Sequence, residues 1–215
     1  SRRPRAGNAV RTLKLTLAYD GTAYAGWQWQ PGQPTVQGVL EAALEKVTGA
    51  GGGRTLASGR TDAGVHALGQ VVGLRTASRL ECPVLLRALN ANLPDDVAVL
   101  DVSEAPRDFH PIRDARAKRY RYVIHDGPVR DVFHRRWSWH VPTRLDEEAM
   151  DRAAAGLTGR HDFRSFQTTG APRKSTVRTL RELWVRRRPA PEEHLVLTEV
   201  EADGSSGRAA CRERG

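Results

Sequence analysis

Two stretches in which apolar residues occupy every second position constrain the fold of this chain most. Residues 13–19 and residues 119–124 both have this pattern, which is the period of a strand with one buried face. The apolar positions are Leu13, Leu15, Leu17 and Tyr19 in the first stretch and Tyr120, Tyr122 and Ile124 in the second. Each half of the chain therefore contains a strand that needs an apolar layer against it.

Helical patterns supply that layer. Residues 36–47 carry an apolar stripe, with Thr35 placed as the N-cap and Gly49 as the C-terminal stop. Further helices are predicted over residues 83–90 and 145–157, and further strands over residues 97–102, 179–186 and 194–202. Strands and helices alternate without a long parallel-strand pattern, so the sequence predicts an α+β fold in two halves, each a sheet with helices on one face.

Changes in composition indicate the domain boundaries. Residues 1–10 have the sequence of a basic arm, and charged, proline-containing sequence over residues 105–117 separates the two halves. The predicted division is a basic arm (1–10), a first α+β domain (11–104), a second α+β domain (105–204) and a terminal segment (205–215).

The charge of the chain favours a polyanionic partner. Its 215 residues carry a formal net charge of +9, and the basic residues are mostly arginines. Arginine binds phosphate bidentately and stacks on bases, so nucleic acid is the first candidate; an arginine bias without functional meaning is the alternative. Cys82 and Cys211 form neither a metal-ligand spacing nor a disulfide framework. Without a long apolar run, the sequence predicts a soluble, cytoplasmic protein with no membrane partner.

The strongest candidate for chemistry lies in residues 57–67. Asp62 is bracketed by Gly59 and Gly64, with strand-like sequence on both sides, so a loop held between two strands is expected to present its carboxylate. Arg60 lies two residues before Asp62. The structural alternative is an Asx-turn, in which Asp62 bonds its own backbone and Arg60 is solvated.

Two other motifs fail in the same residues. Gly59 and Gly64 have the glycine spacing of a P-loop, but Val65 and His66 stand where Lys and Ser or Thr are needed to bind phosphate and magnesium. Asp62 and His66 lie four residues apart, but Gly64 disfavours the helix that would align them as metal ligands. Neither a nucleotide site nor a metal site is predicted here.

Five segments, in the order in which they occur, resemble the motifs of the tRNA pseudouridine synthase A family. The resemblance covers residues 11–204, and its catalytic signature contains Asp62. The segments are Tyr19-Asp20-Gly21-Thr22-Ala23-Tyr24-Ala25-Gly26-Trp27-Gln28, Ser58-Gly59-Arg60-Thr61-Asp62-Ala63-Gly64-Val65-His66, Asn90-Ala91-Asn92-Leu93-Pro94, Asp108-Phe109-His110 and Lys118-Arg119-Tyr120-Arg121-Tyr122.

This resemblance implies a fold, a reaction and partners. The fold is two ferredoxin-like halves forming a continuous antiparallel sheet, with helices on one face and a basic cleft between the halves. The reaction is the isomerisation of uridine to pseudouridine in the anticodon stem-loop of tRNA, at positions 38, 39 and 40, without a metal, nucleotide or other cofactor. The partners are tRNA and a second copy of the chain in a homodimer. A non-catalytic RNA-binding remnant of the family is the alternative.

The resemblance also implies roles for single residues. Asp62 matches the essential aspartate, acting as nucleophile or base. Arg60 would support Asp62 or hold the phosphate of a flipped nucleotide, with a surface salt bridge as the alternative. Tyr120 matches the active-site tyrosine that would stack on the uracil, and Tyr122 on the same strand face is the alternative. Structural roles are expected for His110, His161 and Asp162, and either a surface or a core role for Trp27 and Trp29.

The resemblance stops after Gly204. Family members continue into a helix with an arginine that contacts the catalytic aspartate, whereas residues 205–215 have neither apolar periodicity nor a matching arginine. The sequence therefore predicts a chain that is truncated or altered after Gly204, with reduced stability and activity.

Overall fold

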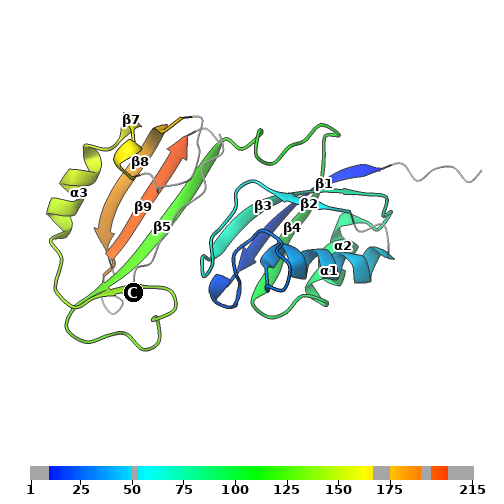
Figure 1. Ribbon diagram of the computed structural model, residues 1–215, viewed down its shortest axis with the longest axis horizontal. Helices are drawn as coiled ribbons and strands as arrows, with labels where there is room; N and C mark the ends of the chain where they lie inside the picture. The colour runs from blue at the N-terminus through cyan, green and yellow to red at the C-terminus, as the bar shows by residue number, and fades with distance from the viewer. Residues whose placement is uncertain (1–9, 50–52, 167–174, 190–194, 203–215) are drawn as a thin grey trace, which may run out of the picture. The chain divides into compact units, whose positions relative to one another are not determined.

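The computed structural model describes residues 10–49, 53–166 and 175–189, and the backbone of residues 195–202. The predicted basic arm (1–10) is described only at Val10, and the terminal segment (205–215) lies outside the described residues. The chain divides into two units, one ending at Asp114 and the other beginning at Ala115 (Figure 1). Each unit has its own sheet and its own apolar core.

The first unit is a four-stranded antiparallel sheet with two helices, in the order β-α-β-β-α-β. The strand order is β2-β3-β1-β4, so β1 lies between two antiparallel neighbours. The elements are β1 (Arg11–Tyr19), the 3₁₀ turn η1 (Gly21–Ala23), α1 (Val36–Thr48), β2 (Thr55–Ala57), β3 (Ala67–Thr76), α2 (Cys82–Asn90) and β4 (Val97–Ala105).

The core of the first unit follows from the two sequence periods. The four apolar positions of β1 that the alternation predicts are all buried, and α1 and α2 pack their apolar stripes against them. The predicted cap of α1 is confirmed, because the Thr35 hydroxyl oxygen accepts a hydrogen bond from the Gly38 N–H at 3.2 Å. Gly49 ends the same helix with a φ of 72°, a conformation that glycine adopts without steric cost.

Trp27 and Trp29 have different environments, which the sequence left open. Trp27 is a core residue whose ring lies 6.2 Å from the ring of Tyr19, whereas Trp29 is half exposed. The Trp27 backbone N–H donates to the Thr61 carbonyl, which holds the residue on the inner side of its loop. Only Trp29 remains at the surface.

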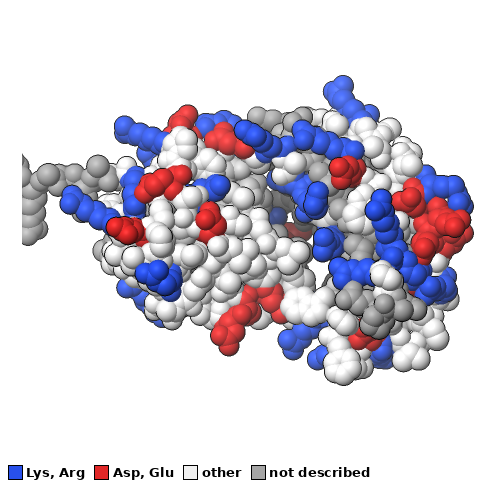
Figure 2. Space-filling view, turned by 180° about the vertical axis from the view of Figure 1, so that it is seen from behind, with Lys and Arg blue, Asp and Glu red and all other residues white. Residues whose placement is uncertain are grey.

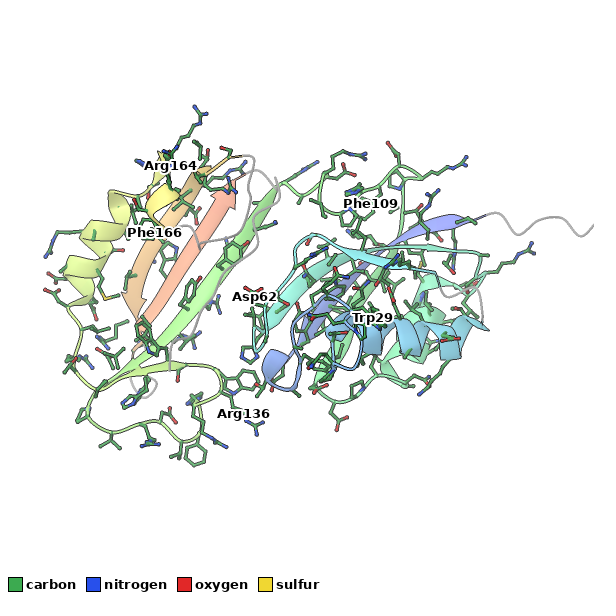
Figure 3. All side chains as sticks on the ribbon, viewed as in Figure 1. Trp29, Asp62, Phe109, Arg136, Arg164 and Phe166 are labelled. Carbon is green, nitrogen blue, oxygen red and sulfur yellow. The ribbon has the colours of Figure 1, made fainter. Side chains whose placement is uncertain are left out.

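The segment after β4 covers the face of the first sheet that lies opposite the helices. Pro111 packs so closely on Gly73 that a Cβ there would lie 3.0 Å from the Pro111 Cδ atom. Thr12 on β1 donates from its hydroxyl to the Arg107 carbonyl at 3.4 Å. Phe109, in one of the family-like segments, lies in the same layer (Figure 3). This segment belongs to the packing of the first unit.

Within the described residues, the second unit has a five-stranded sheet and one α-helix, and its strand order is β6-β5-β9-β8-β7. All its strand pairs are antiparallel except β5 and β6, which are parallel. The elements are β5 (Ala117–Asp126), β6 (Trp139–Val141), α3 (Glu147–Ala155), β7 (Gly159–Asp162), the 3₁₀ turn η3 (Arg164–Phe166), β8 (Val177–Arg187) and β9 (Leu195–Ala202).

The described strands form two hydrogen-bonded sheets, one in each unit, and the single sheet expected across both halves stays a prediction. Two features of the fold differ from the sequence prediction. The sheet of the second unit is not fully antiparallel, because β6 adds to β5 in parallel. Helix α3 is shorter than the predicted 145–157, because Asp146 caps its start by accepting from the Ala149 N–H at 2.9 Å and Gly156 ends it.

A buried ion pair lies beside the small core of the second unit. The Asp126 side chain is fully buried at the end of β5, and both its oxygens accept hydrogen bonds from the Arg187 guanidinium, at 2.7 and 3.0 Å. The Leu145 N–H donates to the same carboxylate at 2.8 Å. Glu147 pairs with the remaining side of the guanidinium. The hydrogen bonds from Arg187 lower the pKa of Asp126 to about 2, against the opposing effect of burial. The pair joins β5, β8 and the start of α3.

Candidate active-site loop

The loop that carries Asp62 connects β2 to its antiparallel neighbour β3 (Figure 3). At its base, the Ser58 N–H donates to the Val71 carbonyl at 2.8 Å, which continues the ladder by one residue. The Ser58 hydroxyl donates to the Gln70 side-chain oxygen at 2.9 Å, and the Gln70 amide donates to the Gly59 carbonyl at 2.5 Å. Gln70 therefore closes the base of the loop from inside β3.

The centre of the loop is fixed by the segment that follows β1. The Thr61 carbonyl accepts from the Trp27 N–H at 3.0 Å, and the Thr61 and Tyr19 hydroxyls lie 2.9 Å apart. On the other side of Asp62, the Gly64 N–H donates to the Tyr24 carbonyl at 3.2 Å. Burial raises the pKa of Tyr19, so its hydroxyl stays neutral and keeps its bonds. Asp62 is thus held between two anchored residues.

Two glycines permit this close contact. A Cβ at Gly21 would lie 2.1 Å from the Val65 carbonyl oxygen, and a Cβ at Gly26 would lie 2.5 Å from the Thr61 carbonyl oxygen. Gly26 also has a φ of 99°, which is strained for any other residue. The sequence shows both glycines, but their role is visible only when the loop lies against them.

We expect Gly26→Ala to destabilise the first unit and to displace the loop, because the new methyl group overlaps the Thr61 carbonyl. Gly32→Ala is the matched control, since Gly32 also has a positive φ of 69° but no atom within 4 Å of the place that the methyl group would take. The control should lose about 1 kcal/mol from backbone strain alone, and Gly26→Ala clearly more. Urea unfolding of both variants measures the difference, and equal losses would show that the contact with Thr61 is unimportant.

Asp62 presents an exposed carboxylate from a fixed backbone. Its carbonyl accepts from the Val65 N–H at 3.2 Å, which forms a turn, while its side chain has no hydrogen bond or ion pair with any described residue. The Asx-turn alternative is therefore wrong for Asp62. Arg60 is also exposed, and within the described residues it forms no ion pair with Asp62. The arrangement suits a carboxylate that meets a ligand from solvent.

His66 ties the end of the loop back to the end of β1. The His66 Nδ1 atom lies 3.1 Å from the Gly21 backbone nitrogen and 3.0 Å from the Asp20 Oδ1 atom. One nitrogen cannot accept from the first and donate to the second. We assign it as the acceptor from the Gly21 N–H, because Asp20 Oδ1 already accepts from the backbone and hydroxyl of Thr22 at 2.9 and 2.6 Å. His66 thus supports the loop.

Tyr120 and Tyr122 lie in the second unit, on the face of β5 that also bears Ile124. Both rings are half-buried, and Ile124 packs with Ala154 of α3 and Val185 of β8. The opposite face of the strand bears exposed Arg119 and Arg121. Asp62 and Arg60 belong to the first unit, and Tyr120 belongs to the second.

The other residues that the sequence singled out have structural contacts. His110 accepts from the Arg113 N–H at 3.3 Å, and its own N–H donates to Asp114 at 2.8 Å. The His161 ring donates to the Thr158 carbonyl at 3.0 Å, and Asp162 accepts from the Arg164 N–H at 3.0 Å. These contacts agree with the structural roles expected for the three residues.

Many basic side chains lie on one face of the second unit. Figure 2 shows Lys and Arg side chains spread over this unit on the face seen from behind. Within the described residues, no group of three or more His, Cys, Asp and Glu side chains is arranged to bind a metal ion. No helix in the described ranges is both long and apolar enough to cross a bilayer.

The fold and the site define a mainly antiparallel α+β protein that presents the Asp62 carboxylate on a braced loop. Residues 16–112 and 153–206 match the family described as tRNA pseudouridine synthase. A protein of Pelobacter propionicus named tRNA pseudouridine synthase A is 44% identical over 195 residues, which cover 91% of this chain and 78% of that protein. The chain belongs to the tRNA pseudouridine synthase family, a family of isomerases.

Two further relatives carry the same name. The protein of Moorella thermoacetica is 52% identical over 74% of this chain, and that of Myxococcus xanthus is 47% identical over 80% of it. The matched part spans 65% of the length of each of these two relatives, which is less than two thirds. Asp62 lies in the first matched range and Tyr120 lies between the two ranges.

Proposed function

We propose that this protein isomerises uridine to pseudouridine in the anticodon stem-loop of tRNA, at positions 38, 39 and 40. The observation that carries the proposal is Asp62, an exposed carboxylate without a protein partner among the described residues, on a loop anchored at Gly59, Thr61 and Gly64 in a chain of this family. Such a group is available to act on a bound nucleotide.

The reaction rearranges bonds without any net loss of atoms. The N-glycosidic bond breaks, the uracil turns while it stays in the site, and a carbon–carbon bond to the same sugar carbon forms as a ring proton leaves and the ring nitrogen regains one. Asp62 acts as nucleophile or as base in this sequence. A fixed loop backbone limits the motion of the carboxylate, which keeps it oriented for these steps.

Arg60 and Tyr120 have supporting roles in the proposal. Arg60 is exposed two residues from Asp62, where it supports the carboxylate or binds the phosphate of the flipped nucleotide. Tyr120 stacks on the uracil, with Tyr122 as its alternative on the same strand face. The partners are tRNA and a second copy of the chain, with no nucleotide cofactor, and the location is the cytoplasm.

The fold supports a ferredoxin-like architecture for the first unit. Its element order β-α-β-β-α-β and its strand order β2-β3-β1-β4 are those of a split β-α-β arrangement. We infer the same relationship for the second unit, whose antiparallel core β5-β9-β8 also packs a helix on one face. The proposed domains are 11–104 and 105–204, with a basic cleft between them as the RNA site.

The experiment is pseudouridine mapping on defined tRNA. Purified protein is incubated with a tRNA transcript that has uridine at positions 38, 39 and 40, and with three transcripts in which one of these is cytidine. Carbodiimide labelling with primer extension then locates the product. In each transcript, we expect pseudouridine at those of positions 38, 39 and 40 that carry uridine. Product at other positions would replace the proposed substrate, and tight binding without any product would favour the RNA-binding remnant.

We expect the affinity for tRNA to fall steeply with salt, because arginines dominate the basic residues of a chain with a net charge of +9. Log affinity should decrease linearly with log salt concentration, with a slope of about 0.7–0.9 per neutralised phosphate. Filter binding between low and physiological salt measures the slope. An affinity that hardly changes over this range would show that phosphate contacts do not dominate binding.

A further inference from the structure

The loop of residues 127–138 connects the parallel strands β5 and β6, and its two ends are tied together. The Gly127 N–H donates to the Val141 carbonyl at 2.9 Å, and the His140 ring donates to the Gly127 carbonyl at 2.9 Å. The His125 ring donates to the Val129 carbonyl at 2.8 Å and stacks on His140, with 5.6 Å between ring centroids. We call residues 127–138 the β5–β6 loop. Hydrogen bonds between its first residues and the adjoining strand ends hold its base together.

The tip of the β5–β6 loop is ordered by its own side chains. One oxygen of Asp131 accepts from the Phe133 and His134 backbone N–H groups at 2.8 and 3.0 Å, and the other accepts from the His134 ring at 2.6 Å. These bonds, the one from the His134 N–H foremost, lower the pKa of Asp131. The Ser138 hydroxyl and N–H both donate to the His134 carbonyl at 3.0 Å. The tip is therefore preorganised by polar bonds, without apolar packing.

The apolar side chains of this region point outwards instead of filling a core. Of the twelve large hydrophobic side chains that are exposed in the described residues, five lie between residues 129 and 139. Phe133 is 86% exposed, which is the highest value in that set. A soluble protein seldom holds aromatic residues in water on an ordered loop unless they meet a partner. The five are Val129, Val132, Phe133, Trp137 and Trp139.

The charge of the loop indicates which partner fits. Arg130, Arg135 and Arg136 are all exposed, and the single acidic residue, Asp131, is engaged in ordering the tip. Figure 3 shows side chains pointing away from the loop along its length, with Arg136 labelled. Aromatic rings interleaved with arginines match RNA with unpaired bases, since rings stack on bases and guanidinium groups bind phosphates. A purely apolar partner would leave the arginines without a role.

We propose that the β5–β6 loop is an RNA-binding surface, in which Phe133 stacks on an unpaired base of the substrate and Arg130 neutralises a neighbouring phosphate. That this RNA is tRNA follows from the proposed function, on which the proposal rests. It concerns residues 127–138, which lie outside the two ranges, 16–112 and 153–206, that match the family. The site is built within the second unit alone.

The test compares the binding of two RNA probes by matched variants of the whole protein. One probe is an anticodon stem-loop in which every uridine is replaced by cytidine, so that no isomerisation takes place during binding. The other is duplex RNA without unpaired nucleotides. Phe133→Ala should weaken stem-loop binding about 5- to 100-fold and leave duplex binding within about twofold. Phe133→Trp should restore stem-loop binding, because a larger ring also stacks.

Controls on the same unit separate this contact from a general effect of the substitutions. Phe166→Ala removes a ring that is 75% exposed and should leave the binding of both probes unchanged. Arg130→Gln should weaken binding to both probes and reduce the salt slope by about 0.7–0.9. Arg152→Gln, at an exposed residue of α3 paired with Glu148, should do neither. Thermal melts of all variants verify that they are folded.

Two results would overturn the inference. One is stem-loop binding by folded Phe133→Ala that equals that of the unaltered protein. The other is loss of a dimer in sedimentation by Phe133→Ala with RNA affinity unchanged, which would make the loop a contact between copies of the chain. The proposed function fails separately, when natural tRNA gains no pseudouridine although Phe133→Ala still lowers the affinity for the cytidine stem-loop.

Discussion

Asp62→Asn is expected to abolish pseudouridine formation while the affinity for tRNA stays within about threefold of normal, since the amide removes no phosphate contact. The amide keeps the size of the side chain, and the loop bonds of Gly59, Thr61 and Gly64 do not involve the Asp62 carboxylate. An amide cannot act as nucleophile or carboxylate base, and loss of such a group lowers the rate by about 10²- to 10⁴-fold or more. Single-turnover assays on tRNA measure the rate.

Asp101→Asn is a matched control for this variant. Asp101 is an exposed aspartate of β4 in the same unit, with a local contact to Ser103, and it has no place in the proposed chemistry. It should leave the rate unchanged. Full activity in Asp62→Asn would remove Asp62 from the mechanism, and weak tRNA binding in that variant would assign the carboxylate to binding instead.

Arg187→Met is expected to cost the second unit about 3–5 kcal/mol of unfolding free energy. The substitution takes both guanidinium hydrogen bonds from the fully buried Asp126 carboxylate, which keeps the Leu145 N–H and the weaker ion pair with the exposed Arg144, whose Nε atom lies 3.8 Å away. The whole free energy of unfolding of a domain is about 5–15 kcal/mol, so this loss would remove a large part of it. Arg152→Met, which breaks an exposed pair on α3, should cost no more than about 0.5 kcal/mol. Urea unfolding compares the two, and similar losses would contradict the importance of the buried pair.

The pH dependence of stability provides a second view of the same pair. The pKa of Asp126 is lowered to about 2 in the folded protein. The ionised carboxylate therefore adds to the free energy of unfolding above the ordinary pKa of an aspartate, and this addition is lost as the pH falls through about 2. The shift corresponds to about 2 kcal/mol. Unfolding free energies measured between pH 5 and pH 2 should therefore decline more in the unaltered protein than in Arg187→Met. Parallel curves would show that Asp126 does not contribute.

The sequence predicts regular elements well where one period persists. The alternation of β1 and the stripe of α1 with its Thr35 cap both fix the element and its buried face, because the period and the cap are local properties. Strand β6 was missed because three residues, Trp139 to Val141, are too few to show a period, and its parallel pairing depends on His140 and Gly127 across a loop. Helix α3 was predicted two residues too long at each end.

The sequence predicted Asp62 as the site residue, but it did not predict the contacts that hold its loop. The glycines of the loop and the family-like motif identify Asp62, and the structure adds why its backbone is fixed. Gln70, Tyr19 and Trp27 support the loop, and Tyr19 and Trp27 are far from Asp62 in the sequence. The two tryptophans look alike in sequence but differ in the structure. The Trp27 backbone N–H donates to the Thr61 carbonyl and its ring is buried, whereas the Trp29 backbone N–H donates to the Gln37 side chain and its ring is half exposed. Such contacts arise from tertiary pairing, which no local pattern encodes.

The bracing of the Asp62 loop by the segment after β1 has a consequence for folding. Tyr19 and Thr61 are 42 positions apart, and Gly21 and His66 are 45 apart, so each contact closes a long stretch of chain. The pairing of β1 with β3 places Tyr19 opposite Ala67, so these contacts need little further loop-closure entropy once the two strands have paired. A peptide containing only β2, the loop and β3 would lack the partners that hold Thr61 and Gly64. The candidate catalytic geometry therefore comes into existence together with the tertiary structure of the first unit.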